Sequence, residues 1–282
     1  MRIATDRCPE RRFELARARP AADLAGVVVR YAGYREGAVW SLRQREVATT
    51  IVPLIINLGP AFRVRLGDGD ALHGSFVAGL YDGYADVAAL GPAQCLQVDL
   101  TPLGARRFFG LPMRELAGRA VALELVAGRA VDALADRLHH AAGWEARFRL
   151  LDDFVRRRLA AAPAPSPAVA WAWQKLVASG GRVRIEALAR ELGWSRKHQA
   201  QRFALEIGAP PKTVARILRF AHARRAILAG PAARDWAGRA LDWGYADQAH
   251  LIREFRAMAG VTPADYARDA AGRFRAVSAG AR

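Results

Sequence analysis

The stretch IEALARELGWSRKHQAQRFALEIGAPPKTVAR, from Ile185 to Arg216, decides the fold of the last third of this chain. A second copy of its pattern, AGRALDWGYADQAHLIREFRAMAGVTPADYAR, runs from Ala237 to Arg268. Four pairs of residues align at one constant offset: Phe203 with Phe255, Gly208 with Gly260, Pro211 with Pro263, and Arg216 with Arg268. Such repetition indicates one structural unit used twice, and two copies are too few for a solenoid.

Each copy has the pattern of a short helix, a glycine turn and a second helix. Gly193 and Gly244 follow the first helix of each copy, where glycine can take the left-handed backbone that ends a helix. Ser195 and Asp247 come next and are good N-caps for the second helix. A short turn with glycine between two helices is the signature of a helix-turn-helix unit.

The second helix of each copy is rich in side chains that contact DNA. It reads SRKHQAQRF from Ser195 and DQAHLIREF from Asp247. Arg, Lys, Gln and His match the donors and acceptors of the major groove, and the first turns of a recognition helix reach the bases. A single helix of this composition is equally consistent with a solvated surface. Two of them, each after a glycine turn and each ending in Phe, favour DNA recognition.

The region from about Trp171 to Arg268 resembles the DNA-binding domain of the AraC/XylS family of bacterial transcription regulators. The second copy carries the match, in its D-Q pair, its R-x-F and its G-x-[ST]-P-x-x-[YF]-R ending. The first copy matches in LARELGWS, in RF, and in its glycine and proline. The resemblance implies two helix-turn-helix units joined by a long helix from about Pro211 to Leu228. It also implies that both recognition helices enter successive major-groove segments on one face of DNA.

The same resemblance assigns roles to individual residues. The family's base-facing positions correspond to Arg196, Lys197, Ala200 and Gln201 in the first unit, and to Gln248, Ala249, His250 and Arg253 in the second. Phe203 and Phe255 correspond to core positions. Gln199 departs from the family, which usually has a buried Leu there. Either this helix packs more loosely, or it is rotated so that Gln199 reads DNA.

Composition agrees with a protein that binds nucleic acid. The 282 residues are enough for about two domains, and the formal net charge is +16. Residues 170–282 contain 20 of the 43 Lys and Arg but only 9 of the 27 acidic residues. A basic balance alone would also fit a membrane surface or an acidic partner. The helix-turn-helix pair decides for double-stranded DNA.

The N-terminal half is predicted to begin with loosely ordered residues, up to about position 22, and then to form short strands. The strands are expected in the runs VVVRY, TTIVPLIINL, FRVRL, SFVAGLY and CLQVDLTP, with turn signals between them. The run from Ile51 to Leu58 is almost wholly apolar and should be the most buried strand. Strands of this number and spacing predict a small barrel or sandwich.

Helical periodicity follows, with helices expected at about 103–109, 112–117, 128–140 and 144–159. The last two could form a dimerisation element, although apolar stripes of this kind more often belong to a core. The proline-rich run AAAPAPSP then indicates a linker. The predicted divisions are a domain at 1–160, a linker at 161–167, a DNA-binding domain at 168–269 and a basic tail at 270–282.

The N-terminal part is similar, more weakly, to the cupin-like sensor domains that precede such DNA-binding domains. The stretches GYRE, IINLG, SFVAGL and QVDLTPLGARRFFGLPMREL carry this similarity. The expected fold class is therefore α+β, with a small cupin-like β-barrel and flanking helices followed by an all-α domain. In relatives of this architecture the barrel binds a small effector or mediates dimerisation.

Enzymatic chemistry finds little support. The predicted barrel contains His73 but not the two or three His plus carboxylate of a metal site, and Cys95 is expected to be a core thiol. The cysteines, Cys8 and Cys95, give no metal or disulfide pattern, so no catalytic residue, metal or cofactor is predicted. A further set of polar residues either lines a pocket or lies on the solvated face of the strands: Arg43, Arg45, Glu46, Arg63, Arg65 and Asp99.

The sequence therefore predicts a one-component transcription regulator that acts in the cytoplasm at the nucleoid. Its expected partners are double-stranded DNA, RNA polymerase, a small effector and a second copy of the chain, with no membrane. One alternative is a regulator without effector, whose barrel only dimerises. Another is a bifunctional protein with an enzymatic N-terminal domain that uses a reactive Cys95.

Overall fold

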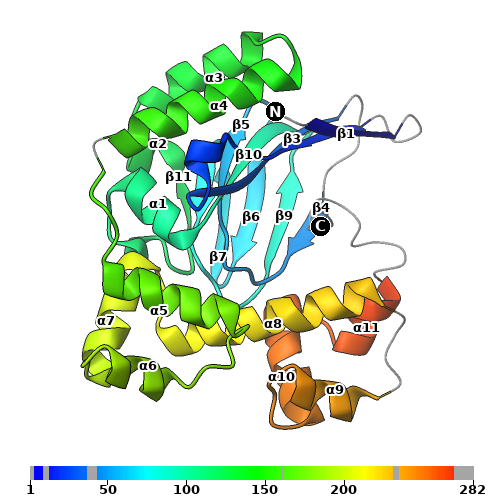
Figure 1. The fold of residues 1–282 in the computed structure, drawn as a ribbon. Helices are drawn as coiled ribbons and strands as arrows, with labels where there is room; N and C mark the ends of the chain where they lie inside the picture. Colours follow the sequence, from blue (N-terminus) through cyan, green and yellow to red (C-terminus); the bar gives the residue numbers. More distant parts are fainter. Residues whose placement is uncertain (1–2, 9–12, 37–42, 161, 231–234, 270–282) are drawn as a thin grey trace.

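The computed structural model describes residues 3–8, 13–36, 43–160, 162–230 and 235–269 of the chain. Its N-terminal part contains two antiparallel β-sheets and several helices, and the described residues from Pro167 onward form helices (Figure 1). This arrangement confirms the predicted α+β class. The predicted basic tail lies outside the described residues. Within them, no helix combines the length and the apolar character needed to cross a membrane.

The described strands of the N-terminal part form two sheets in which every neighbouring pair is antiparallel. The larger sheet has the spatial order β1 (Ile3–Cys8), β2 (Phe13–Ala18), β3 (Val28–Glu36), β10 (Gln94–Leu100), β5 (Val52–Asn57), β8 (Phe76–Ala78) and β11 (Ala120–Ala122). The smaller sheet has the order β4 (Arg43–Glu46), β9 (Ala85–Ala89), β6 (Phe62–Leu66) and β7 (Gly69–His73).

The central strands of the larger sheet have buried side chains on both faces. Because side chains alternate along a strand, Leu54 and Ile56 of β5 point to the side opposite Ile55. Ile55 packs with residues of the smaller sheet, so an apolar cluster lies between the two sheets: Ile55, Phe62, Val64, Phe76, Ala89 and Ala93. Two facing sheets around this cluster correspond to the expected small barrel. Strand β5 lies between β10 and β8 and buries four of its six residues, the same share as β2.

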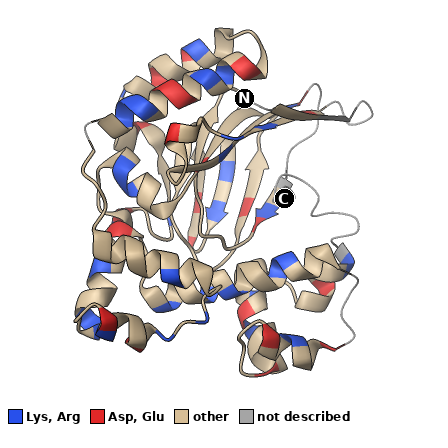
Figure 2. Ribbon diagram, in the orientation of Figure 1, with Lys and Arg blue, Asp and Glu red and all other residues tan. Residues whose placement is uncertain are grey.

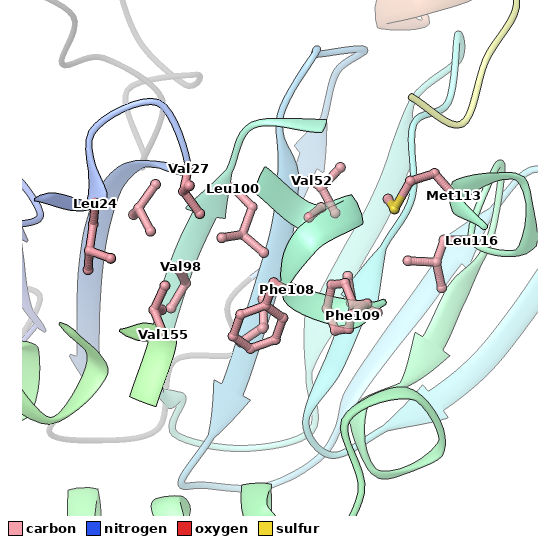
Figure 3. Close-up of a cluster of buried hydrophobic side chains, with 14 of the residues drawn as sticks. Leu24, Val27, Val52, Val98, Leu100, Phe108, Phe109, Met113, Leu116 and Val155 are labelled. Carbon is pink, nitrogen blue, oxygen red and sulfur yellow. The ribbon is translucent and has the colours of Figure 1, made fainter. Parts of the chain in front are cut away.

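Helices cover the other face of the larger sheet. They are η1 (Ala22–Leu24), α1 (Pro102–Phe109), η2 (Met113–Glu115), α2 (Leu123–Ala127), α3 (Ala130–His140) and α4 (Gly143–Ala160). Figure 3 shows Phe108 and Phe109 of α1 in the core beside Val52 and Leu100 of the sheet. The four helices expected between 103 and 159 are therefore present, with the second as a short 3-10 turn.

Helix α4 is fixed against the sheet by a close approach and a buried hydrogen bond. A Cβ atom on Gly33 of β3 would lie 2.2 Å from the Trp144 ring, so this strand position has room only for glycine. The hydroxyl of Tyr31 donates a 2.8 Å hydrogen bond to the Asp152 carboxylate. Both groups are buried, and pairing avoids the cost of leaving them without partners.

The prediction of loosely ordered residues up to position 22 is wrong. Residues 13–18 form β2, which pairs with β3 along its whole length and buries Leu15, Ala16 and Ala18. The chain also forms β4, β7 and β9, which the sequence did not predict. These strands are rich in Arg, Asp and Ala, and Asp and Ala have a weak intrinsic preference for β structure. Pairing with neighbouring strands stabilises them instead.

The C-terminal helices are α5 (Pro167–Ala178), α6 (Ile185–Glu191), α7 (Arg196–Glu206), α8 (Pro211–Ala229), α9 (Trp236–Asp242), α10 (Gln248–Ala259) and α11 (Pro263–Asp269). Helix α8 is the expected long helix between the units. Helices α6 and α7 lie near one end of α8, and α9, α10 and α11 lie near the other (Figure 1). The main hydrophobic core runs without a break from the larger sheet into α5, α7 and the start of α8.

Candidate nucleic-acid interface

Both helix-turn-helix units have the turn and the cap that their sequences predicted. Gly193 and Gly244 have φ angles of 63° and 82°, which are left-handed values that other residues rarely adopt. The Ser195 hydroxyl accepts a 3.1 Å hydrogen bond from the His198 amide at the start of α7. The Asp247 carboxylate accepts a 2.7 Å hydrogen bond from the His250 amide at the start of α10. These local contacts fix the start of each recognition helix.

Aromatic residues determine which face of each recognition helix turns inward. Phe203 of α7 is fully buried in the main core. Phe255 of α10 is fully buried in a separate cluster, with ring centroids 4.9 Å from Phe220 of α8 and 5.4 Å from Tyr266 of α11. Because these faces are held inside, the opposite faces of α7 and α10 are presented to solvent.

The first recognition helix exposes three of its four predicted base-facing residues. Arg196, Lys197 and Gln201 are exposed, and Ala200 is half-buried. Arg196 makes a 3.4 Å ion pair with Glu186 of α6. Both partners are largely exposed, and such pairs contribute at most about 1 kcal/mol. This contact is therefore weak enough to be exchanged for a contact with DNA.

Three of the four predicted residues of the second recognition helix are also exposed, and the fourth is engaged within the protein. Gln248, Ala249 and Arg253 are exposed. His250 accepts a 3.2 Å hydrogen bond from the Ala246 amide at Nδ1, and its Nε2 lies 3.3 Å from Glu254. An accepting Nδ1 assigns the ring proton to Nε2, which faces the carboxylate. These two contacts hold the His250 ring, whose side chain is 30% exposed, against its own unit.

Gln199 is a core residue. Its side chain is 1% exposed, and its Nε2 has no hydrogen-bond partner among the described residues. Of the two possibilities for this position, the structure therefore has Gln199 in the place of the family's leucine, directed away from the outer face of α7. A buried amide without a partner costs about 1–3 kcal/mol, so this position is a local defect of the first unit.

The buried carboxylate of Glu254 is a feature of α10 that the sequence did not reveal. Its Oε1 accepts a 2.8 Å hydrogen bond from Arg216 Nε, and its Oε2 lies 3.6 Å from Arg219 Nη2. Both arginines belong to α8, so these pairs attach the second recognition helix to the helix between the units. Position 254 is the variable residue of the R-x-F pattern, and no signal in the sequence marked it as a partner of α8.

Positive charge surrounds this helical region. Figure 2 shows Lys and Arg along α8 and on the helices near both of its ends. Helix α8 alone contains Lys212, Arg216, Arg219, Arg224 and Arg225. Phosphate groups are attracted by such a surface whatever the base sequence.

Cys95 and His73 are the side chains of the N-terminal part that the sequence raised as candidates for chemistry. In the ranges that the structure describes, no group of three or more His, Cys, Asp and Glu side chains could hold a metal ion. Burial raises the pKa of the Cys95 thiol to about 12, so the thiol is protonated at neutral pH. Burial likewise lowers the pKa of His73.

The candidate pocket residues divide between the two sides of the strands. Arg45 pairs with Asp86, while Arg63 and Arg65 pair with Asp70, all on the outer side of the smaller sheet. Asp99 is 1% exposed and accepts a hydrogen bond from Arg30 at 2.5 Å. Glu46 is exposed at the end of β4. The side chain of Arg43 lies outside the described part of the structure.

Residues 188–269 match a family described as a helix-turn-helix domain, and residues 16–122 match a domain of unknown function, DUF6597. No curated protein matches the chain. Among solved structures, an apo variant of ToxT from Vibrio cholerae strain SCE256 is similar at 12% identity, with a TM-score of 0.46 over 84% of this chain and 96% of that one.

Two further solved structures are similar at comparably low sequence identity. ToxT of the same strain with a bound unsaturated fatty acid is 11% identical, with a TM-score of 0.44 over 83% of this chain and 96% of that one. The AraC-like transcriptional activator CuxR is 15% identical, with a TM-score of 0.34 over 80% of this chain and 86% of that one.

Proposed function

We propose that the chain, whose residues 188–269 match a helix-turn-helix domain, is an AraC-like transcription regulator that recognises one specific DNA site with both recognition helices. Helices α7 and α10 enter successive major-groove segments on one face of the duplex. The arginines and lysines around them contact the phosphates. Phosphate contacts supply affinity and position, while base contacts supply specificity.

One observation carries this proposal: both recognition helices present predicted base-facing side chains to solvent. Arg196, Lys197 and Gln201 of α7 and Gln248 and Arg253 of α10 are exposed, although each helix is anchored by a fully buried Phe on its other face. Long polar side chains on the exposed face of a helix can reach a base edge while the buried face stays packed in the core.

Individual roles follow from these positions. Arg and Lys suit guanine O6 and N7, and Gln suits adenine N6 and N7, so Arg196, Lys197, Gln201, Gln248 and Arg253 are proposed as the base readers. Ala200 and Ala249 offer methyl groups for a thymine methyl. His250 is proposed to act chiefly by holding Glu254, because both of its ring nitrogens have partners inside the unit.

The N-terminal domain, proposed as residues 1–160 and joined by a linker at 161–167, is assigned a regulatory role. A small effector is proposed to bind between its two sheets. There the partly buried side chains of Tyr34, Val87 and Cys95 border the apolar cluster. A ligand of this domain would change DNA binding only if it prefers one arrangement of the protein over another.

The remaining parts of the proposal concern partners and location. A second copy of the chain and RNA polymerase are proposed as partners, and the protein would act at the nucleoid in the cytoplasm, where bacterial promoters are found. Enzymatic activity is not part of the proposal. The protonated state of Cys95 at neutral pH supports leaving out a reactive thiol.

Selection from a random pool of duplex DNA with the purified full chain tests the proposed function. The selected DNA should share two short conserved segments, and binding should remain specific as salt is raised from about 50 to 200 mM. Recovery of unrelated sequences, with affinity that disappears at the higher salt, would show phosphate attraction without base recognition.

A further inference from the structure

The N-terminal domain contacts the second helix-turn-helix unit where its recognition helix ends. The Ala48 amide, just after β4, donates a 3.1 Å hydrogen bond to the Met258 carbonyl in the last turn of α10. Next to it, Arg45 and Tyr84 pack on Gly260, the left-handed residue that ends α10. A Cβ atom there would lie 2.3 Å from Arg45 and 3.0 Å from Tyr84.

The first unit is contacted at the equivalent place. Gly208, which aligns with Gly260 in the repeat, follows the end of α7 with a φ angle of 95°. A Cβ atom on it would lie 3.1 Å from the carbonyl oxygen of Met113 in η2. The same turn of the repeated motif therefore faces the N-terminal domain in both units, at opposite ends of α8.

A chain of ion pairs connects the N-terminal domain to the second recognition helix itself. Arg216 of α8 donates from Nη1 to Asp82, in the loop between β8 and β9, and from Nε to Glu254 of α10, both at 2.8 Å. Its counterpart in the second copy, Arg268, is 77% exposed and pairs with Asp265 of its own helix. Arg216 thus connects the N-terminal domain to α10, whereas the equivalent Arg268 pairs only within α11 among the described residues.

None of these contacts covers the proposed reading faces. The N-terminal domain touches the ends of α7 and α10, and Arg216 reaches the buried Glu254, whereas Lys197, Gln201, Gln248 and Arg253 are exposed. The N-terminal domain therefore does not act as a cover over the DNA-binding surface. It touches both units in a way that can fix their relative placement.

We propose that Arg216 is a positioning residue, which ties Asp82 of the N-terminal domain to Glu254 and so holds α10 at the spacing from α7 that a two-segment DNA site requires. This inference rests on the proposed function. Two linked recognition helices increase the affinity for one duplex most when their spacing matches the two segments of the site. A unit free to move must be ordered on binding, which lowers affinity.

Asp82→Ala tests this role with the full chain, because Asp82 is partly exposed and makes no base contact. Affinity is measured for two DNAs: the selected two-segment site, and the same DNA with the segment read by α10 replaced. Affinity for the two-segment site should fall at least about fivefold, the lower end of usual couplings between sites. Affinity for the one-segment DNA should change less than about twofold, since α7 keeps its own contacts.

Asp70→Ala is the matched control. Asp70 has nearly the same side-chain exposure as Asp82, 35% against 36%, and pairs with arginines on the outer side of the smaller sheet. It should leave both affinities unchanged. Asp82→Glu, which keeps the carboxylate, should recover part of the loss. Arg216→Lys should reproduce the selective loss, because lysine has one nitrogen in place of the separate Nε and Nη1 donors that reach Glu254 and Asp82.

Each result decides the matter. An Asp82→Ala protein that binds the two-segment site like the wild type, binds it more tightly, or weakens equally on both DNAs would overturn the positioning role. A wild-type protein that does not distinguish the two DNAs would instead contradict the proposed function, because α10 would then contribute no specific contact.

Discussion

A Gln199→Leu substitution is expected to stabilise the first helix-turn-helix unit. The amide is 1% exposed and its Nε2 has no partner among the described residues, so removing it recovers about 1–3 kcal/mol. Fitting a branched leucine into the same space costs up to about 1.5 kcal/mol. The middles of the two ranges, about 2 and about 0.75 kcal/mol, leave an expected net gain of about 1 kcal/mol.

Thermal and urea unfolding of the full chain measure this gain. For proteins of somewhat smaller size, 1 kcal/mol raises the midpoint of thermal unfolding by about 2–4 °C, so an increase of about 2–4 °C is expected. Gln201→Leu is the control, because Gln201 is exposed on the same helix two residues on. It should change stability by no more than about 0.5 kcal/mol.

DNA binding distinguishes the two roles considered for this residue. If Gln199 is a core defect, Gln199→Leu should bind the selected DNA within about twofold of the wild type, a free-energy change within about 0.5 kcal/mol. A Gln199→Leu protein that is no more stable than the wild type would show that the amide is satisfied in the native protein. A selective loss of specific binding would show that Gln199 reads DNA and that α7 is rotated relative to this structure.

Three other substitutions and one chemical test follow from the same geometry. Lys197→Ala should relax base preference in one segment of the site by about 1–3 kcal/mol, and Arg253→Ala should do so only in the other, as measured by competition with single-base variants. His250→Ala should lower the free energy of unfolding by about 0.5–1.5 kcal/mol while base preference at each position stays the same, because its ring bonds to Ala246 and Glu254. In a Cys8→Ser background, Cys95 should react with a maleimide at neutral pH much more slowly in the native protein than after denaturation, since burial raises the pKa of its thiol. Labelling at the same rate in the native protein would contradict this raised pKa.

The elements that the sequence predicted well are those specified by a few neighbouring residues. Gly193 and Gly244 end helices through a backbone conformation that glycine adopts easily, and Ser195 and Asp247 cap the next helix within one turn. Such signals act over three or four positions, so a single sequence contains them in full. The apolar strand β5 and helices α1, α3 and α4 were predictable for a similar reason, from hydrophobic periodicity.

What the sequence did not predict depends on contacts between distant residues. Strand β2 contains charged residues and forms because β3 lies beside it. The contact of His250 within its unit requires Glu254, which in turn pairs with two arginines of α8. Asp82 and Arg216 are 134 positions apart, and nothing local in either stretch identifies the other.

Hydroxyl-radical and methylation footprinting on the selected DNA, with the wild type and Arg253→Ala side by side, tests most directly whether both recognition helices read one site. The account predicts two protected major-groove segments on one face of the duplex, about one helical turn or 10 base pairs apart, with Arg253→Ala weakening only one of them. A single protected segment, or two segments that Arg253→Ala weakens alike, would contradict the claim that α7 and α10 bind successive segments of the major groove.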